Sequence, residues 1–231
     1  MESLSKIREK VRLALNINVP PYLMDHQYRG KAVLPAVEAI EILAVSTLAH
    51  LPGTAVNSIR EARFDKFLVI EDGQEPIEAF NDLEIFDNDR VISKFITKTK
   101  SKKAMITRTL EHATLCFHDV SSVPELPPPG IPTGSGPSSS KCHIPPESIY
   151  QSLVPFGPGY HNLKELSLFK EGAEGQVFAP LLGEPNRVLG SPFPLDAAFH
   201  AACVWGQRYA GLVGFPVGFG LRRLFTPTRS G

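Results

Sequence analysis

The segment that most limits the possible folds is residues 35–50, PAVEAIEILAVSTLAH. Its apolar residues recur at helical spacing, and Glu38 and Glu41 fall on another face of the same helix. Proline suits the first turn of a helix, so the pattern predicts one long, largely buried helix that begins near Pro35.

The residues after this helix have the texture of a sheet. Four segments rich in Val, Ile, Phe and Thr lie near residues 58–70, 77–86, 90–99 and 104–118. Turn-forming or densely charged stretches separate them, which predicts antiparallel strands. A single apolar helix followed by such strands favours an α+β fold in which the sheet curls around the helix.

The second half of the chain repeats this order. Residues 196–210, DAAFHAACVWGQRYA, are apolar on most faces, follow Pro194, and precede a predicted strand at 215–224. The helix and strand of the first half align loosely with those of the second, which indicates an internal duplication. Two unrelated helix-then-strand units explain these residues equally well.

The stretch between the halves differs in composition. Of the 20 residues at 121–140, 15 are Pro, Gly or Ser, and such a run predicts a linker. The expected parts are therefore an N-terminal subdomain at 1–120 and a C-terminal subdomain at 141–231. The second half stops soon after its predicted strand, so we expect its sheet to lack several strands.

Charge and cysteine content exclude several classes of protein. Lys and Arg number 24, as do Asp and Glu, so the formal net charge is zero and gives no support to a nucleic-acid or anionic-membrane protein. No stretch approaches the ~20 apolar residues that span a bilayer. Three cysteines without a CxxC pair, and no signal-peptide pattern, make the reducing cytoplasm the expected compartment.

The first candidate site is His26–Gly30–Pro35, in DHQYRGKAVLP. At this composition, the H-x(3)-G-x(4)-P pattern is expected by chance only about 0.05 times. A histidine just before a buried helix can project into a pocket at the start of that helix. Gly30 would let the backbone approach a ligand and offer its N–H group.

The second candidate site is Asp196 with His200, one helical turn apart. Asp is a favoured helix-capping residue, so an N-cap is the simplest role for Asp196. The alternative is a carboxyl group beside an apolar pocket, oriented by His200. If His26 and Asp196 face each other, they form a base and an acid in different environments, as proton-transfer chemistry requires.

Other chemical signatures are missing. The sequence has no GxSxG, HExxH, Walker loop or GxGxxG after a strand, and its other histidines show no metal-ligand spacing. We therefore expect no metal and no cofactor.

These residues resemble the dehydratase domains of polyketide synthases and polyunsaturated fatty-acid synthases, which are double hot-dog folds. The family's histidine motif is matched by His26, Gly30 and Pro35, and its aspartate motif by Asp196 and His200. Its YGPxFxGL stretch is similar to residues 156–163, FGPGYHNL, which contain Phe156, Gly157, Pro158 and Tyr160. Residues 215–224 resemble its LPxxxxxxRL strand. Two departures stand out: Phe156 occupies a position that is usually Tyr, and Ala36 one that is commonly Gly.

The resemblance implies two antiparallel sheets, each wrapped around a long central helix, and a hydro-lyase of fatty-acid or polyketide biosynthesis. The substrate would be a (3R)-hydroxyacyl thioester on the phosphopantetheine arm of an acyl carrier protein, and the product a trans-2-enoyl thioester. His26 would act as base, Asp196 as acid, and the remaining motif residues would orient the substrate. The implied partners are the carrier protein, neighbouring synthase domains and a possible second copy in a homodimer.

Two other functions remain open at this point. A product-template type domain would use a similar His and Asp to cyclise a polyketone. A non-catalytic hot-dog module would support docking or dimerisation within a megasynthase, and the expected missing strands and Phe156 favour this role.

Overall fold

The computed structural model describes residues 5–71, 73, 76–100, 107–118, 141–181 and 187–230. The predicted linker at 121–140 lies outside these ranges, so the division of the chain into subdomains at that segment stays a prediction.

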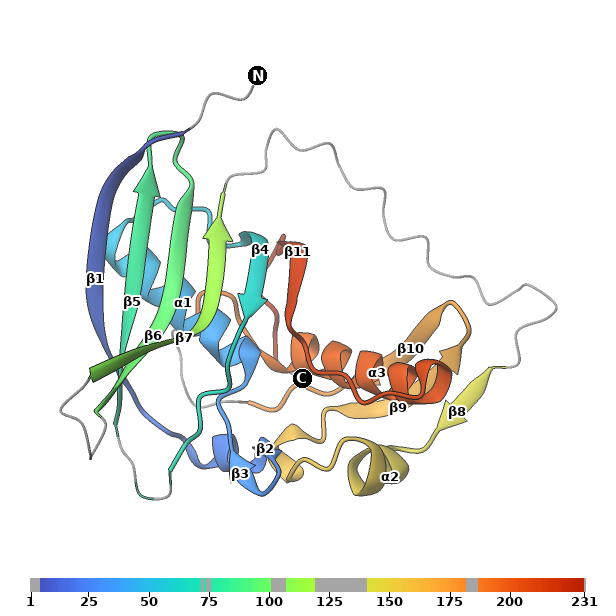
Figure 1. Ribbon diagram of the computed structural model, residues 1–231. Coiled ribbons are helices and arrows are strands. Elements are labelled where there is room, and N and C mark those ends of the chain that lie inside the picture. Colours follow the sequence, from blue (N-terminus) through green and yellow to red (C-terminus); the bar gives the residue numbers. More distant parts are fainter. Residues whose placement is uncertain are drawn as a thin grey trace.

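The largest element is a six-stranded antiparallel sheet (Figure 1). Its order is β1-β5-β6-β7-β4-β11, and every neighbouring pair is antiparallel. The strands are β1 (Ile7–Ile17), β4 (Ser58–Phe64), β5 (Ile77–Phe86), β6 (Val91–Lys100), β7 (Thr107–Phe117) and β11 (Gly218–Arg223). A strand forms in each of the four segments predicted after the first helix, but β4 ends at Phe64, six residues before the predicted end, and residues 104–106 lie outside the described ranges. Strand β1 has no counterpart among the predictions.

Helix α1 (Ala36–His50) packs against one face of this sheet, as predicted, and contacts β5, β6 and β7. Pro35 is its N-cap, one residue before the first turn. The core between helix and sheet includes the fully buried Leu43, Phe95 and Leu115. Glu38 and Glu41 do not lie on a solvent-facing side of the helix: both are buried, because Arg187 and a backbone N–H group reach them from the second half.

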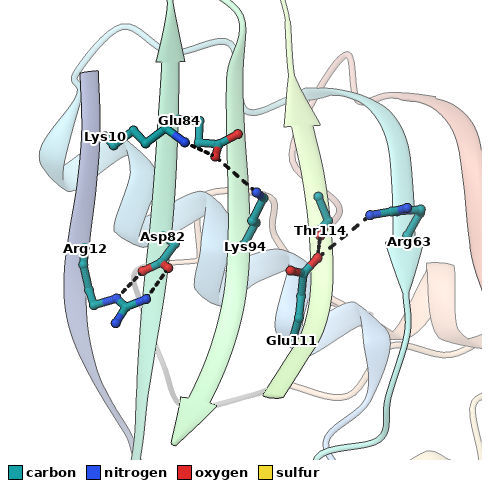
Figure 2. Close-up of polar contacts among 8 residues, drawn as sticks. All are labelled: Lys10, Arg12, Arg63, Asp82, Glu84, Lys94, Glu111 and Thr114. Atoms are coloured by element: carbon teal, nitrogen blue, oxygen red, sulfur yellow. Dashed lines mark hydrogen bonds and ion pairs between the residues drawn. The ribbon is translucent and has the colours of Figure 1, made fainter. Parts of the chain in front are cut away.

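The opposite face of the sheet carries charged residues (Figure 2). Arg12 donates two hydrogen bonds of 2.6 Å to Asp82 on the neighbouring strand. Glu84 lies 3.0 Å from Lys10 and 3.3 Å from Lys94. Alternation of charged and apolar residues thus gives this sheet one polar face and one that covers α1.

The second half forms a smaller layer. Its strands β8 (Cys142–Ile144), β9 (Leu163–Phe169) and β10 (Gly172–Val177) make an antiparallel sheet in the order β10-β9-β8. A short helix, α2 (Pro146–Ser148), follows β8, and helix α3 (Phe193–Ala210) contacts β9, β10 and α1. The predicted second helix is confirmed, but it begins three residues earlier than expected, with Pro192 as its N-cap.

Strand β11 joins the two halves. It pairs with β4, so that the strand following α3 lies beside the strand following α1 (Figure 1). We expected two separate sheets, one around each long helix. Instead, β11 from the second half hydrogen-bonds to β4 and covers the edge that β4 would otherwise expose. Both predicted helix-then-strand units form, and their strands are neighbours.

The described ranges contain no helix that is long and apolar enough to cross a membrane. Within the same ranges, no group of three or more His, Cys, Asp or Glu side chains is placed to hold a metal ion.

Candidate active site

His26 is held by the backbone that leads into α1. It follows a 3-10 helix, η1 (Pro21–Asp25), and precedes the hairpin of β2 (Gln27–Tyr28) and β3 (Lys31–Ala32). The Nδ1 atom of His26 lies 2.9 Å from the carbonyl oxygen of Val33. Because a carbonyl only accepts, Nδ1 carries the proton and donates it, which leaves Nε2 of the neutral ring as a base.

Burial lowers the pKa of His26, and this effect outweighs the opposing influence of the Asp196 carboxylate. The nearby His200 lowers it further. His26 is thus held in the neutral form that can accept a proton, and it lies close enough to Asp196 and His200 for both to affect its titration.

Asp196 and His200 lie inside α3, both buried, at 4% and 3% exposure. The N-cap of α3 is Pro192, so the capping role considered for Asp196 is wrong. Oδ2 of Asp196 is 2.9 Å from Nε2 of His200, but the contact lacks hydrogen-bond geometry. Neither atom has a hydrogen-bond partner elsewhere in the described ranges. A buried carboxyl oxygen without a hydrogen-bond partner calls for an explanation, and a bound ligand would supply one.

Phe156 lies between the two histidines. Its ring centroid is 4.3 Å from that of His26 and 5.1 Å from that of His200. Phe156 also packs against both hydrophobic clusters of the protein, the one around α1 and the one around α3. The structure therefore brings His26, Phe156, His200 and Asp196 into one cluster that spans the two halves.

The loop that carries Phe156 is attached directly to the residue before His26. The backbone N–H of Gly157 donates to the carbonyl oxygen of Asp25 at 2.8 Å, and that of Gly159 donates to Asp25 Oδ2 at 2.7 Å. A Cβ on Gly157 would lie 2.5 Å from Asp25 Cγ, so only glycine fits there. The short helix η3 (Pro158–Tyr160) continues this loop.

Tyr160 completes the aromatic wall of the cluster. Its ring centroid is 5.1 Å from that of His26, and the side chain is fully buried. Its hydroxyl has no hydrogen-bond partner among the described residues. Burial, reinforced by the carboxylates of Glu38 and Asp196, raises the pKa of Tyr160 far above its ordinary value, so the phenol keeps its proton as a donor.

Gly30 and Pro35 shape the backbone on either side of the site: Gly30 forms part of a turn and Pro35 caps α1. Arg29 and Gly30 form the two-residue turn of the β2–β3 hairpin, with φ of 51° and 73°. Positive φ at both positions explains the glycine. Gly30 is exposed at this turn, away from the buried part of the cluster, whereas Pro35 caps α1.

Asp25 and Tyr150 belong to the site but had no distinguishing pattern in the sequence. The Tyr150 hydroxyl lies 3.5 Å from Nδ1 of His200 and accepts the N–H of Leu163 at 2.7 Å. Its ring stacks on His161, whose Nε2 donates to the carbonyl oxygen of Phe156 at 3.0 Å. These residues surround the predicted ones and position them.

No protein-family model matches the chain, and no curated protein matches it in sequence. Solved structures do match. A trans-AT polyketide synthase (PKS) dehydratase domain from Brevibacillus brevis has a TM-score of 0.70 at 16% identity, over 92% of this chain and 76% of that one. The PpsC dehydratase domain from Mycobacterium tuberculosis has a TM-score of 0.68 at 17% identity, over 94% and 78%.

A third match is the CurK dehydratase, solved as an inactive mutant with a histidine replaced by phenylalanine. Its TM-score is 0.69 at 17% identity, over 97% of this chain and 81% of that one. At this level of identity the matches establish architecture. The chain therefore has the fold of polyketide-synthase dehydratase domains, the double hot-dog architecture that its motifs resemble.

Proposed function

We propose that this protein removes water from a (3R)-hydroxyacyl thioester carried by an acyl carrier protein. The observation that supports it most is the contact of His26 Nδ1 with the carbonyl oxygen of Val33, which leaves Nε2 free to act as a base. Its Nδ1–H is committed to Val33, its pKa is lowered, and its free nitrogen lies in one cluster with the carboxyl group of Asp196. A base and an acid in different environments are what β-elimination needs.

The reaction begins at the α-carbon of the substrate. Nε2 of His26 takes the α-proton, and the electron pair moves toward the thioester carbonyl. A backbone donor must stabilise the developing enolate oxygen, and we assign this role to Gly30 N–H from the histidine motif; because Gly30 is exposed, this assignment places the thioester carbonyl at the solvent side of His26. Imidazole becomes imidazolium in this step.

The second half of the reaction breaks the bond to the β-hydroxyl. For this step Asp196 has to enter as the acid: beside His200, it gives a proton to the departing oxygen while the enolate electrons form the trans-2-enoyl double bond. The products are the enoyl thioester, water, imidazolium and carboxylate. Proton transfer from His26 back to Asp196, directly or through water, restores the starting state, and no cofactor takes part.

The Tyr160 hydroxyl is the third group that we place in this site. It is a buried donor with no partner in the described ranges, next to the His26 ring. A substrate oxygen that accepts this hydroxyl would satisfy it, so we assign Tyr160 to substrate orientation. Phe156 supplies the apolar surface between the two histidines.

The test is turnover of a (3R)-hydroxyacyl pantetheine thioester, followed by mass spectrometry. General acid–base groups of this kind contribute about 10²- to 10⁴-fold, so His26→Ala and Asp196→Asn should each lower kcat/KM by at least 100-fold. Val177→Trp, on the exposed strand β10, is the control that should retain activity. Unchanged turnover by both site variants would end the assignment. A folded wild-type protein without turnover would favour the docking module instead.

The similar structures come from polyketide synthases, so we also propose that neighbouring synthase domains supply the substrate and consume the product. A polyunsaturated fatty-acid synthase offers the same carrier-bound chemistry. The carrier protein is the partner that the mechanism requires in either setting.

A further inference from the structure

A cavity of about 820 Å³ lies between strand β1 and helix α1, and it adjoins the proposed active site through Tyr22, whose ring centroid is 6.1 Å from that of Tyr160. Neither His26 nor Asp196 lines it. Its walls are mainly apolar and include Leu13, Leu15, Ile17, Ile42, Val45 and Ala49. One end is polar and is formed by Tyr22, Glu38, Glu41 and Arg187. An apolar cavity of this size with a few convergent polar groups has the composition of a small-molecule site.

The polar end is built around a buried ion pair. Nη2 of Arg187 lies 3.0 Å from Oε2 and 3.2 Å from Oε1 of Glu38, and it donates to the Tyr22 hydroxyl at 2.8 Å. The two charged side chains are only 11% and 7% exposed. Glu41, one helical turn further along α1, accepts the backbone N–H of Leu189 through Oε2 at 3.1 Å.

Three atoms of this end remain unsatisfied. Nε and Nη1 of Arg187 and Oε1 of Glu41 are buried behind the wall of the cavity and have no hydrogen-bond partner in the ranges that the structure describes, so a ligand reaches them once the covering side chains turn aside. A buried polar atom without a partner costs about 1–3 kcal/mol, so three of them in one cluster call for an explanation. Arg187 offers N–H donors, and Glu41 offers an oxygen.

The raised pKa of Glu41 indicates which kind of ligand group could bind beside it. Burial raises the pKa of Glu41, an effect that exceeds the lowering by the backbone N–H groups of Leu189 and Val188 and by Arg187. A buried carboxyl group that holds its proton readily can share it with a second carboxyl group. Arg187 can then donate to the remaining oxygen of that second group.

We propose that this cavity binds a linear aliphatic carboxylic acid, with its carboxyl group between Arg187 and Glu41 and its chain along the wall formed by β1 and α1. A carboxyl group supplies the acceptor that Arg187 lacks and shares one proton with Glu41. The six residues at 13–18 that line the cavity span about 17 Å, room for a chain of about twelve carbons. An alkyl amine has no acceptor for Arg187, and an alkane has neither group. This proposal does not depend on the proposed dehydratase function, because neither His26 nor Asp196 lines the cavity.

The experiment is calorimetric titration of the protein with dodecanoate below its micelle concentration. We expect one molecule per chain. Val45→Trp should weaken binding at least tenfold, because Val45 is 39% exposed on the wall of the cavity and a larger ring would fill the path of the chain. Val177→Trp is the matched control: Val177 is 40% exposed, lies on β10 and does not line the cavity. It should bind as the wild type does.

Two further measurements separate this site from the others. Arg187→Met should not bind dodecanoate. If that variant does not fold, the result for Val45→Trp decides the test. His26→Ala should bind dodecanoate normally, and dodecylamine should not compete. The proposal is overturned if Val45→Trp binds like the wild type, if binding disappears in His26→Ala, or if the amine competes as well as the acid. Hydroxyacyl turnover by Val45→Trp should be unchanged, so the two proposals fail separately.

Discussion

Replacement of Gly157 by alanine tests whether Asp25 fastens the Phe156 loop to His26. A Cβ at position 157 would lie 2.5 Å from Asp25 Cγ and 2.7 Å from Asp25 Cβ, closer than non-bonded carbons approach. Asp25 cannot simply move away, because its carbonyl oxygen holds the N–H of Gly157 and its Oδ2 holds that of Gly159.

The magnitude follows from these contacts. Overpacking in a closed site costs about 1–3 kcal/mol, and a hydrogen bond to a charged group contributes about 1.5–3 kcal/mol. Gly157→Ala should relieve its overlap by partly breaking the bond to Gly159, so we expect a loss of about 2–4 kcal/mol in the free energy of unfolding. Phe156 would shift with the loop, and a displacement near 1 Å can lower kcat/KM about 100-fold.

A double-mutant cycle measured by urea unfolding isolates the contact. Asp25→Ala removes Cγ and both carboxylate oxygens but keeps Cβ, so Gly157→Ala should lose part of its overlap and cost less in that background, with a coupling of about 1–2 kcal/mol. Gly220→Ala is the control, since a Cβ there meets nothing within 4 Å. Effects of Gly157→Ala and Asp25→Ala that add to within about 0.5 kcal/mol would refute the clamp.

Four further predictions concern the site and the sheet. Tyr160→Phe should raise the free energy of unfolding, because it deletes a buried hydroxyl without a described partner, yet lower kcat/KM. Equal or better activity would remove Tyr160 from the mechanism. The acid limb of log kcat/KM should have its midpoint below the ordinary His value of about 6.5, since burial lowers the pKa of His26; a midpoint above it would contradict this. The unfolded chain binds a proton that folded His26 resists, so unfolding free energy should fall as the pH drops below about 6.5 and level off below the folded pKa. His26→Gln should flatten that decline. Arg12→Ala should change stability by less than about 1 kcal/mol, since its pair with Asp82 is on the surface, and a larger loss in thermal unfolding would show a role beyond that pair.

The sequence predicts the two long helices because each must bury most of its surface, and burial shows as a run of apolar residues. Strand β1, IREKVRLALNI, escaped prediction because it is an edge strand with β5 as its one neighbour in the sheet and much of its surface exposed. Strand β10, GAEGQV, has no buried residue at all. Its strand conformation comes from pairing with β9, and a contact of that kind leaves no local pattern.

Some residues of the candidate site could likewise be predicted from the sequence, and others could not. His26 and Asp196 could be predicted because their residue types are chemically specific and each stands beside an apolar helix. Asp25 could not, since its partner, Gly159 N–H, is 134 positions away and a backbone amide carries no residue identity. The buried state of Glu38 was likewise hidden, because Arg187, 149 positions on, is what allows it.

The proposed base and acid come from different halves of the chain, so their separation depends on the contacts between those halves. The Asp25 bonds to the Phe156 loop, the pairing of β11 with β4, and the Arg187–Glu38 ion pair all cross from one half to the other. Phe156 packs into both hydrophobic clusters, so the space between His26 and His200 is set by the same ring that joins the two cores. The geometry of the proposed site and the attachment of the halves therefore depend on the same contacts. A substitution at the Asp25–Gly157 contact should reduce both together, whereas His26→Ala should abolish turnover and leave the halves attached.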